Sequence, residues 1–244
     1  MDQLKNFADD RLINGCVYCG GTAETRDHVP SRILLEPPYP ENLPVVGCCE
    51  RCNQGFSKDE EYVACLLEAV RAGSTDPEKI HRPSVARIFQ RAPALRARIE
   101  SAKREVEGRI EFGVEAGRIE NVMLKLARGH AAFELNQTCR EAPEHFWCGS
   151  YHAISPEVRQ VFDAPHEQKL FGEVGSRGLQ RMLVTQLTVR SPDGNESQIG
   201  LLLNDWIEVQ PGNYRYLAID DIGGPMIRLV VAEYVACEIG WRTK

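Results

Sequence analysis

The 244-residue sequence predicts an α+β protein with a cysteine-rich β-hairpin and helix near its N-terminus, central helices, and a C-terminal α+β domain with an antiparallel sheet. Three observations support this class. Two Cys-x-x-Cys pairs lie early in the chain, residues 119–135 carry apolar side chains at helical spacing, and strand-like runs alternate with turns beyond Leu179. We therefore expect three parts, at residues 1–72, 73–140 and 141–244.

In the first part, the pattern predicts two short strands followed by a helix. Residues 22–30 contain the first predicted strand, and residues 42–46 form the second. A run of prolines between them indicates an extended loop, because proline fixes φ and lacks an N–H group. Cys49 and Cys52 open a helix that we expect to continue to about Val70.

The central part is predicted to be mainly helical. Helical spacing of apolar residues extends over residues 84–107, where Pro93 must break or kink the helix. Glycines then indicate a hairpin within residues 109–120, before the helix at residues 119–135.

The last part combines a short helix with strands. Ser155 and Pro156 are typical of a helix start. Two hairpins are expected at residues 181–203 and 205–219, each with a glycine-containing turn. Residues 226–241 form a long apolar segment that we expect to be one strand or a strand followed by a helix.

The charge of the chain is negative overall but segregated. The formal net charge is −6, whereas a nucleic-acid-binding protein usually has a basic surface. Residues 82–104 nevertheless contain seven arginine or lysine side chains and one acidic residue, Glu100. Any contact with nucleic acid is therefore expected to use a local patch.

The sequence also predicts where the protein resides. No apolar run is long enough to cross a membrane. The polar and acidic N-terminus lacks the basic start and apolar middle of a signal peptide. We therefore expect a cytoplasmic protein that does not bind membranes.

The two Cys-x-x-Cys pairs predict a structural zinc site. Cys16, Cys19, Cys49 and Cys52 supply the four thiolates that a tetrahedral Zn²⁺ ion requires. The gap of 29 residues between the pairs is longer than in a compact zinc ribbon, which implies an inserted functional element. Cys48, next to the second pair, is not expected to be a ligand.

Two alternatives to the zinc site remain open. The four cysteines could belong by coincidence to a reduced core. A redox or metal-sensing role is weaker, because neither pair has the strand-then-helix setting of a thioredoxin-like motif.

A second group of polar residues lies between and just after the two cysteine pairs. Asp27 and His28 lie within the motif Arg-Asp-His-Val-Pro. Asn42 follows, and Asn53 comes directly after the last cysteine. The order of these residues resembles the HNH endonuclease family, also called His-Me finger or ββα-metal nucleases, in its zinc-stapled form. The resemblance covers residues 16–61. It implies a metal-dependent endonuclease that hydrolyses phosphodiester bonds.

The chemistry of these residues is consistent with the implied roles. His28 can act as general base near neutral pH. Asp27 and Asn53 would hold a catalytic Mg²⁺ or Mn²⁺ ion, because both offer hard oxygen ligands. Asn42 would hold the loop that orients His28. Neighbouring side chains of a regular strand point to opposite faces, so Asp27 and His28 can share one site only across a bulge or a strand edge.

Candidate phosphate contacts lie on the predicted helices. Arg51 and Lys58 lie on the helix after the cysteines, and Arg87 and Arg91, four residues apart, share a helix face. A solvated helix face explains the same residues without any ligand. The remaining histidines have no motif around them, and we expect them to be structural.

The implied partners follow from the resemblance. DNA is favoured over RNA as the substrate. One active site cuts one strand, so a double-strand break would require a homodimer or two nicks. The acidic remainder of the chain suggests a protein partner or regulatory ligand that delivers or releases the enzyme. A different class of function is a non-catalytic zinc module that binds nucleic acid or a protein.

The nuclease interpretation includes several alternatives. The enzyme nicks one strand or cuts both, and it acts at specific sites or generally. Phage defence, toxin activity and mobile-element biology are three settings that use such nucleases.

Overall fold

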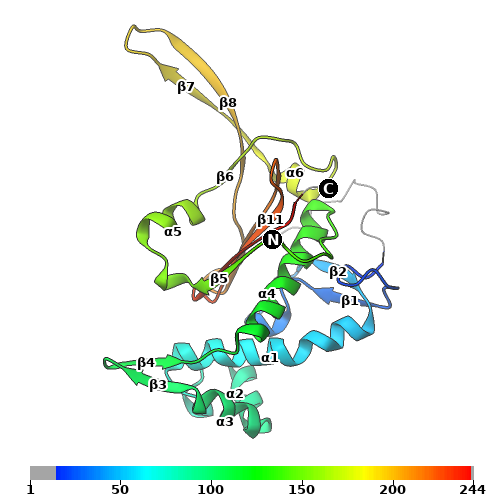
Figure 1. The fold of residues 1–244 in the computed structure, drawn as a ribbon, viewed down its shortest axis with the longest axis vertical. Helices are drawn as coiled ribbons and strands as arrows, with labels where there is room; N and C mark the ends of the chain where they lie inside the picture. The colour runs from blue at the N-terminus through cyan, green and yellow to red at the C-terminus, as the bar shows by residue number, and fades with distance from the viewer. Residues whose placement is uncertain (1–14, 243–244) are drawn as a thin grey trace.

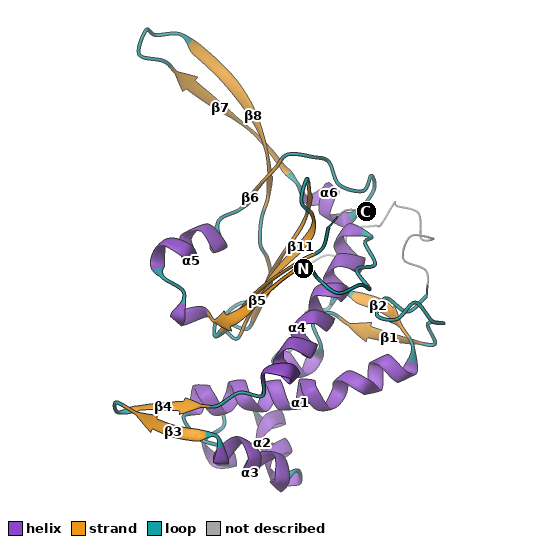
Figure 2. Ribbon diagram, viewed as in Figure 1, coloured by secondary structure: helices purple, strands orange, loops and turns teal. Residues whose placement is uncertain are grey.

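The computed structural model describes residues 15–242, so residues 1–14 of the predicted first part lie outside the described chain. The α+β class is confirmed, because helices and several antiparallel sheets alternate along these residues (Figure 2). Among the described residues, no helix is both long and apolar enough to cross a bilayer.

The first part folds as two strands and a helix, in the predicted order. Strand β1 (Thr25–His28) pairs antiparallel with β2 (Val45–Cys48), and the single-turn helix η2 (Arg32–Leu34) lies in the loop between them. Helix α1 (Glu50–Ala72) follows directly. Gly73 ends this helix in the left-handed conformation, φ 61°, which glycine adopts without a Cβ penalty.

Pro93 divides the first central helix, as predicted. Helix α2 (Pro83–Arg91) is followed by α3 (Pro93–Ser101), because a proline inside a helix removes one hydrogen bond and clashes with the preceding turn. The turn η3 (Pro77–Lys79) precedes them.

The predicted hairpin at residues 109–120 is wrong in position. The structure has β3 (Lys103–Val106) and β4 (Arg109–Phe112), so the preceding helix ends before residue 107. The hairpin turns at Glu107 and Gly108, which both have positive φ, as a two-residue turn between twisted strands requires.

Helix α4 (Ala116–His130) connects the two halves of the molecule. It continues into a wider turn, η4 (Ala131–Leu135), and together they confirm the predicted helix at residues 119–135. Figure 1 shows α4 crossing α1 and ending at the C-terminal sheet. The helix packs closely against the first part at Gly129, where an added Cβ would lie 2.5 Å from Val29 Cγ2.

The main C-terminal sheet has five antiparallel strands within the described residues. The predicted single strand or strand–helix at residues 226–241 is two strands, because Ala232 and Glu233 both have positive φ and reverse the chain. Around this sheet lie η5 (Tyr151–Ala153) and α5 (Pro156–Asp163), which starts after Ser155 as predicted. The strand order is β5 (His145–Ser150), β12 (Val235–Gly240), β11 (Gly224–Val231), β10 (Tyr214–Asp221) and β9 (Ile207–Gln210).

A second, smaller sheet extends away from the body. It contains β6 (His166–Gln168), β8 (Glu196–Asn204) and β7 (Leu183–Arg190), with the short helix α6 (Arg177–Arg181) before β7. The β7–β8 hairpin projects beyond the other elements (Figure 1). One of its faces carries exposed apolar side chains, which include Leu183, Leu187, Val189 and Ile199.

One hydrophobic core joins residues from all three predicted parts. It contains side chains of α1, α2, α4 and the main C-terminal sheet. A smaller apolar cluster packs the cysteine-rich turn, β2 and Val29, which follows β1, against Ala132 and Phe133 of η4. The predicted boundaries at residues 72 and 140 remain predictions.

The contact between α4 and the first part predicts that Gly129→Ala destabilises the protein. Its Cβ would lie 2.5 Å and 2.9 Å from the two Val29 methyl carbons and 3.3 Å from Val29 Cβ, so Val29 or the helix has to shift. We expect a loss of about 1–3 kcal/mol of unfolding free energy in urea titrations. Gly55→Ala is the matched control, because its Cβ meets nothing within 4 Å and alanine favours a helix by about 1 kcal/mol. Equal effects of both changes would contradict the close packing.

Candidate functional site

Four cysteines form the candidate metal centre. The sulfur atoms of Cys16, Cys19, Cys49 and Cys52 all lie within 4.8 Å of one another. The first pair lies on a tight turn closed by Cys16 N–H donating to Gly21 O at 2.7 Å. The second pair lies directly after β2 and at the start of α1, so the expectation that neither pair has a strand-then-helix setting is wrong. Four thiolates at this spacing could bind a structural Zn²⁺ ion.

The pKa values of the cysteines differ within the cluster and do not by themselves identify the ligands, because burial also raises the pKa of Cys52, one of the four. Burial alone would raise the pKa of Cys16, but hydrogen bonds from backbone N–H groups, first that of Cys49, lower its pKa to about 6. Burial and the neighbouring Cys16 raise the pKa of Cys48 to about 12, so its thiol stays protonated. Cys48 is not one of the four clustered cysteines.

Asp27 lies inside the protein, in a network of charged and polar side chains. Its exposed fraction is 7%, and its Oδ2 atom accepts hydrogen bonds from Tyr18 Oη at 2.7 Å and from Lys125 Nζ at 2.8 Å. Lys125, on α4, also donates to Ser31 and Glu60. Lys125, Ser31 and Glu60 were not predicted from the sequence as site residues.

Asn53 contacts β1 at Thr25. Its Nδ2 group donates to Thr25 Oγ1 at 3.2 Å, and Thr25 Oγ1 donates to Cys48 O at 2.8 Å. Asn53 therefore ties the start of α1 to β1. Asn42 lies half-exposed in the loop before β2, and its organising role remains a prediction.

Asp27 and Asn53, the predicted ligands of a catalytic metal, do not fit an open Mg²⁺ or Mn²⁺ site. The pairing of β1 with β2 continues in register from Thr25 to His28, without a bulge, so Asp27 and His28 point to opposite faces. The Asp27 oxygen that faces the interior already accepts two hydrogen bonds. Mg²⁺ requires octahedral oxygen ligands and usually retains several waters, for which this buried network provides no ready place.

His28 is half-buried at the end of β1. Burial lowers the pKa of His28, and the positive charge of Arg32 lowers it further, against a smaller opposing effect of Asp27. The imidazole is therefore neutral at pH 7, the form that accepts a proton.

Arg32 also belongs to a basic hollow, which we call the arginine-lined concavity. It has a volume of about 740 Å³ and lies between the loop after β1 and helix α2. Arg87 and Arg91, predicted to contact phosphate, both lie in its wall, and Arg91 is paired with Glu61. The polar side chains of its wall are Arg32, Tyr39, Arg82, Ser84, Arg87, Gln90 and Arg91.

The structure separates the other two predicted phosphate contacts from this concavity. Arg51 and Lys58 are exposed on α1 and are not part of its wall. Arg82 is buried and anchors the concavity, because it donates to the carbonyl oxygens of Ile33 and Leu35 at 2.6 Å each. Arg82 belongs to the basic segment predicted from the sequence, but no site role was predicted for it. Arg32 was not predicted to lie beside that segment.

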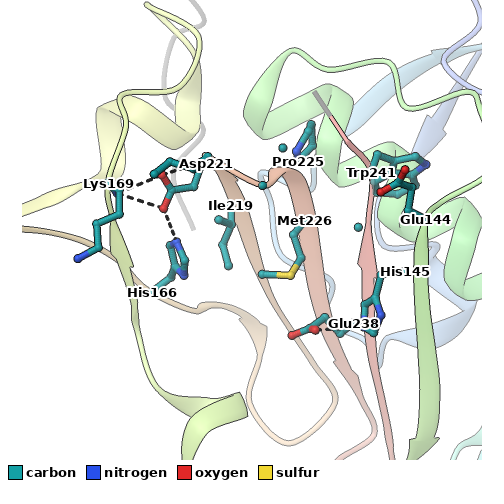
Figure 3. A pocket seen from close by; sticks show the side chains of 14 residues that line it. Glu144, His145, His166, Lys169, Ile219, Asp221, Pro225, Met226, Glu238 and Trp241 are labelled. Atoms are coloured by element: carbon teal, nitrogen blue, oxygen red, sulfur yellow. Dashed lines mark hydrogen bonds and ion pairs between the residues drawn. The ribbon is translucent and has the colours of Figure 1, made fainter. Parts of the chain in front are cut away.

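A second pocket, of about 360 Å³, lies on the main C-terminal sheet (Figure 3). His166 Nε2 lies 2.8 Å from Asp221 Oδ2, and His145 Nε2 lies 3.2 Å from Glu238 Oε1 on the other side of Met226. Asp221 also accepts hydrogen bonds from the backbone of Lys169. The sequence analysis treated both histidines as structural, and these pairs hold them in place.

The clustered cysteines predict one zinc ion per chain. We expect Cys49→Ala to lose this zinc and to melt at a lower temperature, because three thiolates hold the ion less well and the start of α1 loses its cap. Cys48→Ala, one residue away, should retain it. Metal analysis beside a thermal melt checks both variants, and loss of zinc from Cys48→Ala as well would contradict the ligand assignment.

Comparison of the chain with models of known protein families, with curated proteins and with solved structures finds no match. The resemblance of residues 16–61 to HNH endonucleases therefore stays a prediction from the motif. The function has to be inferred from the geometry of His28, the clustered cysteines and the arginine-lined concavity.

Proposed function

We propose that the chain is a zinc-stapled nuclease of HNH type that hydrolyses phosphodiester bonds in nucleic acid, with DNA as the favoured substrate. The observation that carries this proposal is the position of His28. A neutral, half-exposed imidazole lies close enough to Arg32 for the arginine charge to lower its pKa, and Arg32 lines the arginine-lined concavity.

The proposed roles follow from charge and position. Arginines of the concavity hold the phosphate backbone, which dominates the affinity of proteins for nucleic acid. Arg87 is exposed, and no ion pair of its side chain is found among the described residues, so its charge is free for a phosphate. His28 accepts the proton of the attacking water. The guanidinium of Arg32 stabilises the negative charge that develops on the phosphoryl oxygens.

The four-cysteine centre stabilises the hairpin that carries His28. A zinc ion there would join the turn before β1 to the start of α1, and so hold the strand that carries His28. No catalytic step is assigned to a second metal, because Asp27 and Asn53 do not fit an open divalent site.

A non-catalytic zinc module that binds nucleic acid is the second candidate. The closed network around Asp27 favours it, because HNH chemistry normally requires a metal beside the general base. A homodimer, which would bring two active sites to the two strands of a duplex, belongs to the nuclease candidate. A protein partner belongs to both candidates, since the net charge of −6 disfavours tight binding of nucleic acid by the free chain.

Cleavage and binding of DNA and RNA by His28→Ala separate the two candidates. If the proposal holds, this change lowers cleavage about 100-fold, the scale of general-base catalysis, and leaves binding unchanged. Nicked plasmid and shortened labelled oligonucleotides measure cleavage. If the zinc-replete wild type binds either nucleic acid but cuts neither, the binding module is correct.

Arg87→Gln tests the arginine-lined concavity. The loss of one phosphate contact should weaken binding and reduce the salt dependence of log K by about one. Arg104→Gln is the control, because Arg104 is exposed on β3, outside the concavity. Equal weakening by both changes would show that binding follows total charge and not this site.

The pH dependence of cleavage tests the link between Arg32 and His28. The lowered pKa of His28 places the acid limb of kcat/KM below the ordinary histidine value of 6.5. Arg32→Gln removes a positive charge that disfavours the imidazolium, so the pKa rises and the limb moves to higher pH. An acid limb that stays in place in Arg32→Gln would contradict the role of His28 as the base.

A further inference from the structure

The buried network around Asp27 contains a cation supplied by the protein itself. Lys125 of α4 has an exposed fraction of 1%, and its ammonium group lies between the carboxylates of Asp27 and Glu60. We infer that the Lys125 ammonium is the resident cation of this carboxylate pair and closes the position to a divalent metal.

The ammonium group is fully coordinated. A lysine has three N–H donors, and Lys125 has three acceptors in contact with Nζ. These are Ser31 Oγ at 2.6 Å, Asp27 Oδ2 at 2.8 Å and Glu60 Oε1. The acceptors come from the loop after β1, from β1 and from α1, so one nitrogen joins three segments to α4.

The acceptors are also occupied by other donors. Tyr18 donates to the same Asp27 oxygen, and Ser31 donates to the same Glu60 oxygen, that contact Lys125. Neither carboxylate has a buried oxygen without a hydrogen-bond partner. A metal ion could therefore gain Asp27 Oδ2 and Glu60 Oε1, the two oxygens that contact Lys125, only by displacing donors that are already well placed.

Aromatic rings cover another side of the ammonium. The Phe56 ring centroid lies 5.7 Å from Lys125 Nζ, and the Tyr18 ring packs edge-on against Phe56 at 5.1 Å. Rings accommodate an ammonium through cation–π attraction but cannot replace the waters that Mg²⁺ retains.

The charges of Asp27, Glu60 and Lys125 also disfavour a divalent metal at this position. Two carboxylates and one ammonium leave a single net negative charge in the buried network. A divalent ion beside the retained ammonium would place three positive charges against two negative ones in a medium of low dielectric. Metal binding thus requires Lys125 to leave, although its side chain is packed inside the protein.

Titration with Mn²⁺ in the absence of nucleic acid tests this inference, so its outcome does not depend on whether the chain is a nuclease. The zinc-replete full chain is titrated, and electron paramagnetic resonance measures free Mn²⁺. We expect no Mn²⁺ bound at this position in the wild type. Lys125→Met should bind one Mn²⁺ per chain, and Lys79→Met, an exposed control, should behave as the wild type.

Two results would overturn the inference. One is a wild-type chain that binds one Mn²⁺ ion and loses it in Asp27→Asn. The other is a Lys125→Met chain that keeps its zinc and its cooperative melt but gains no Mn²⁺. If Lys125→Met does not fold, Lys125→Gln, which retains a hydrogen-bond donor without the charge, replaces it, and the wild-type titration still decides.

Discussion

The ammonium group of Lys125 holds β1, α1 and α4 in one arrangement. Its contact with Asp27 fixes which face of β1 points into the protein, and the alternation of side chains along a strand then turns His28 outward. Removal of one partner from a buried ion pair typically costs about 3–5 kcal/mol. The orientation of His28 therefore depends on a residue that lies far from it in the sequence.

The contact between Lys125 and Asp27 gives the two faces of the β1–β2 hairpin different properties. The inner side is a closed network of paired charges, and the sulfur cluster fastens one end of the hairpin to α1. The outer side carries a neutral histidine whose pKa the charge of Arg32 lowers, and Arg32 also lines the arginine-lined concavity. A chain with net negative charge thus concentrates positive charge where a phosphate backbone could approach a base.

The features predicted from the sequence are those that depend on neighbouring residues. The spacing of Cys-x-x-Cys determines a local turn, Pro93 ends a helix by its own geometry, and alternating apolar residues produce strands. The hairpin at β3 and β4 was displaced because Glu107 adopts a positive φ that the sequence does not signal.

The environment of Asp27 could not be predicted, because it is created by tertiary contacts. Lys125 lies 65 residues beyond Glu60, inside a helix whose sequence shows only an apolar face. The resemblance of residues 16–61 ends before it. Arg32 and Arg87 come together for the same reason, since the loop after β1 packs beside α2 only in the folded chain.

Anomalous diffraction from a crystal soaked in Mn²⁺, recorded at the zinc and manganese edges, tests the central claim most directly. We expect zinc at Cys16, Cys19, Cys49 and Cys52, Lys125 Nζ between Asp27 and Glu60, and no manganese peak beside Asp27. A manganese ion bound by Asp27 and Asn53, with Lys125 displaced from the network, would contradict the claim and restore a metal-dependent active site.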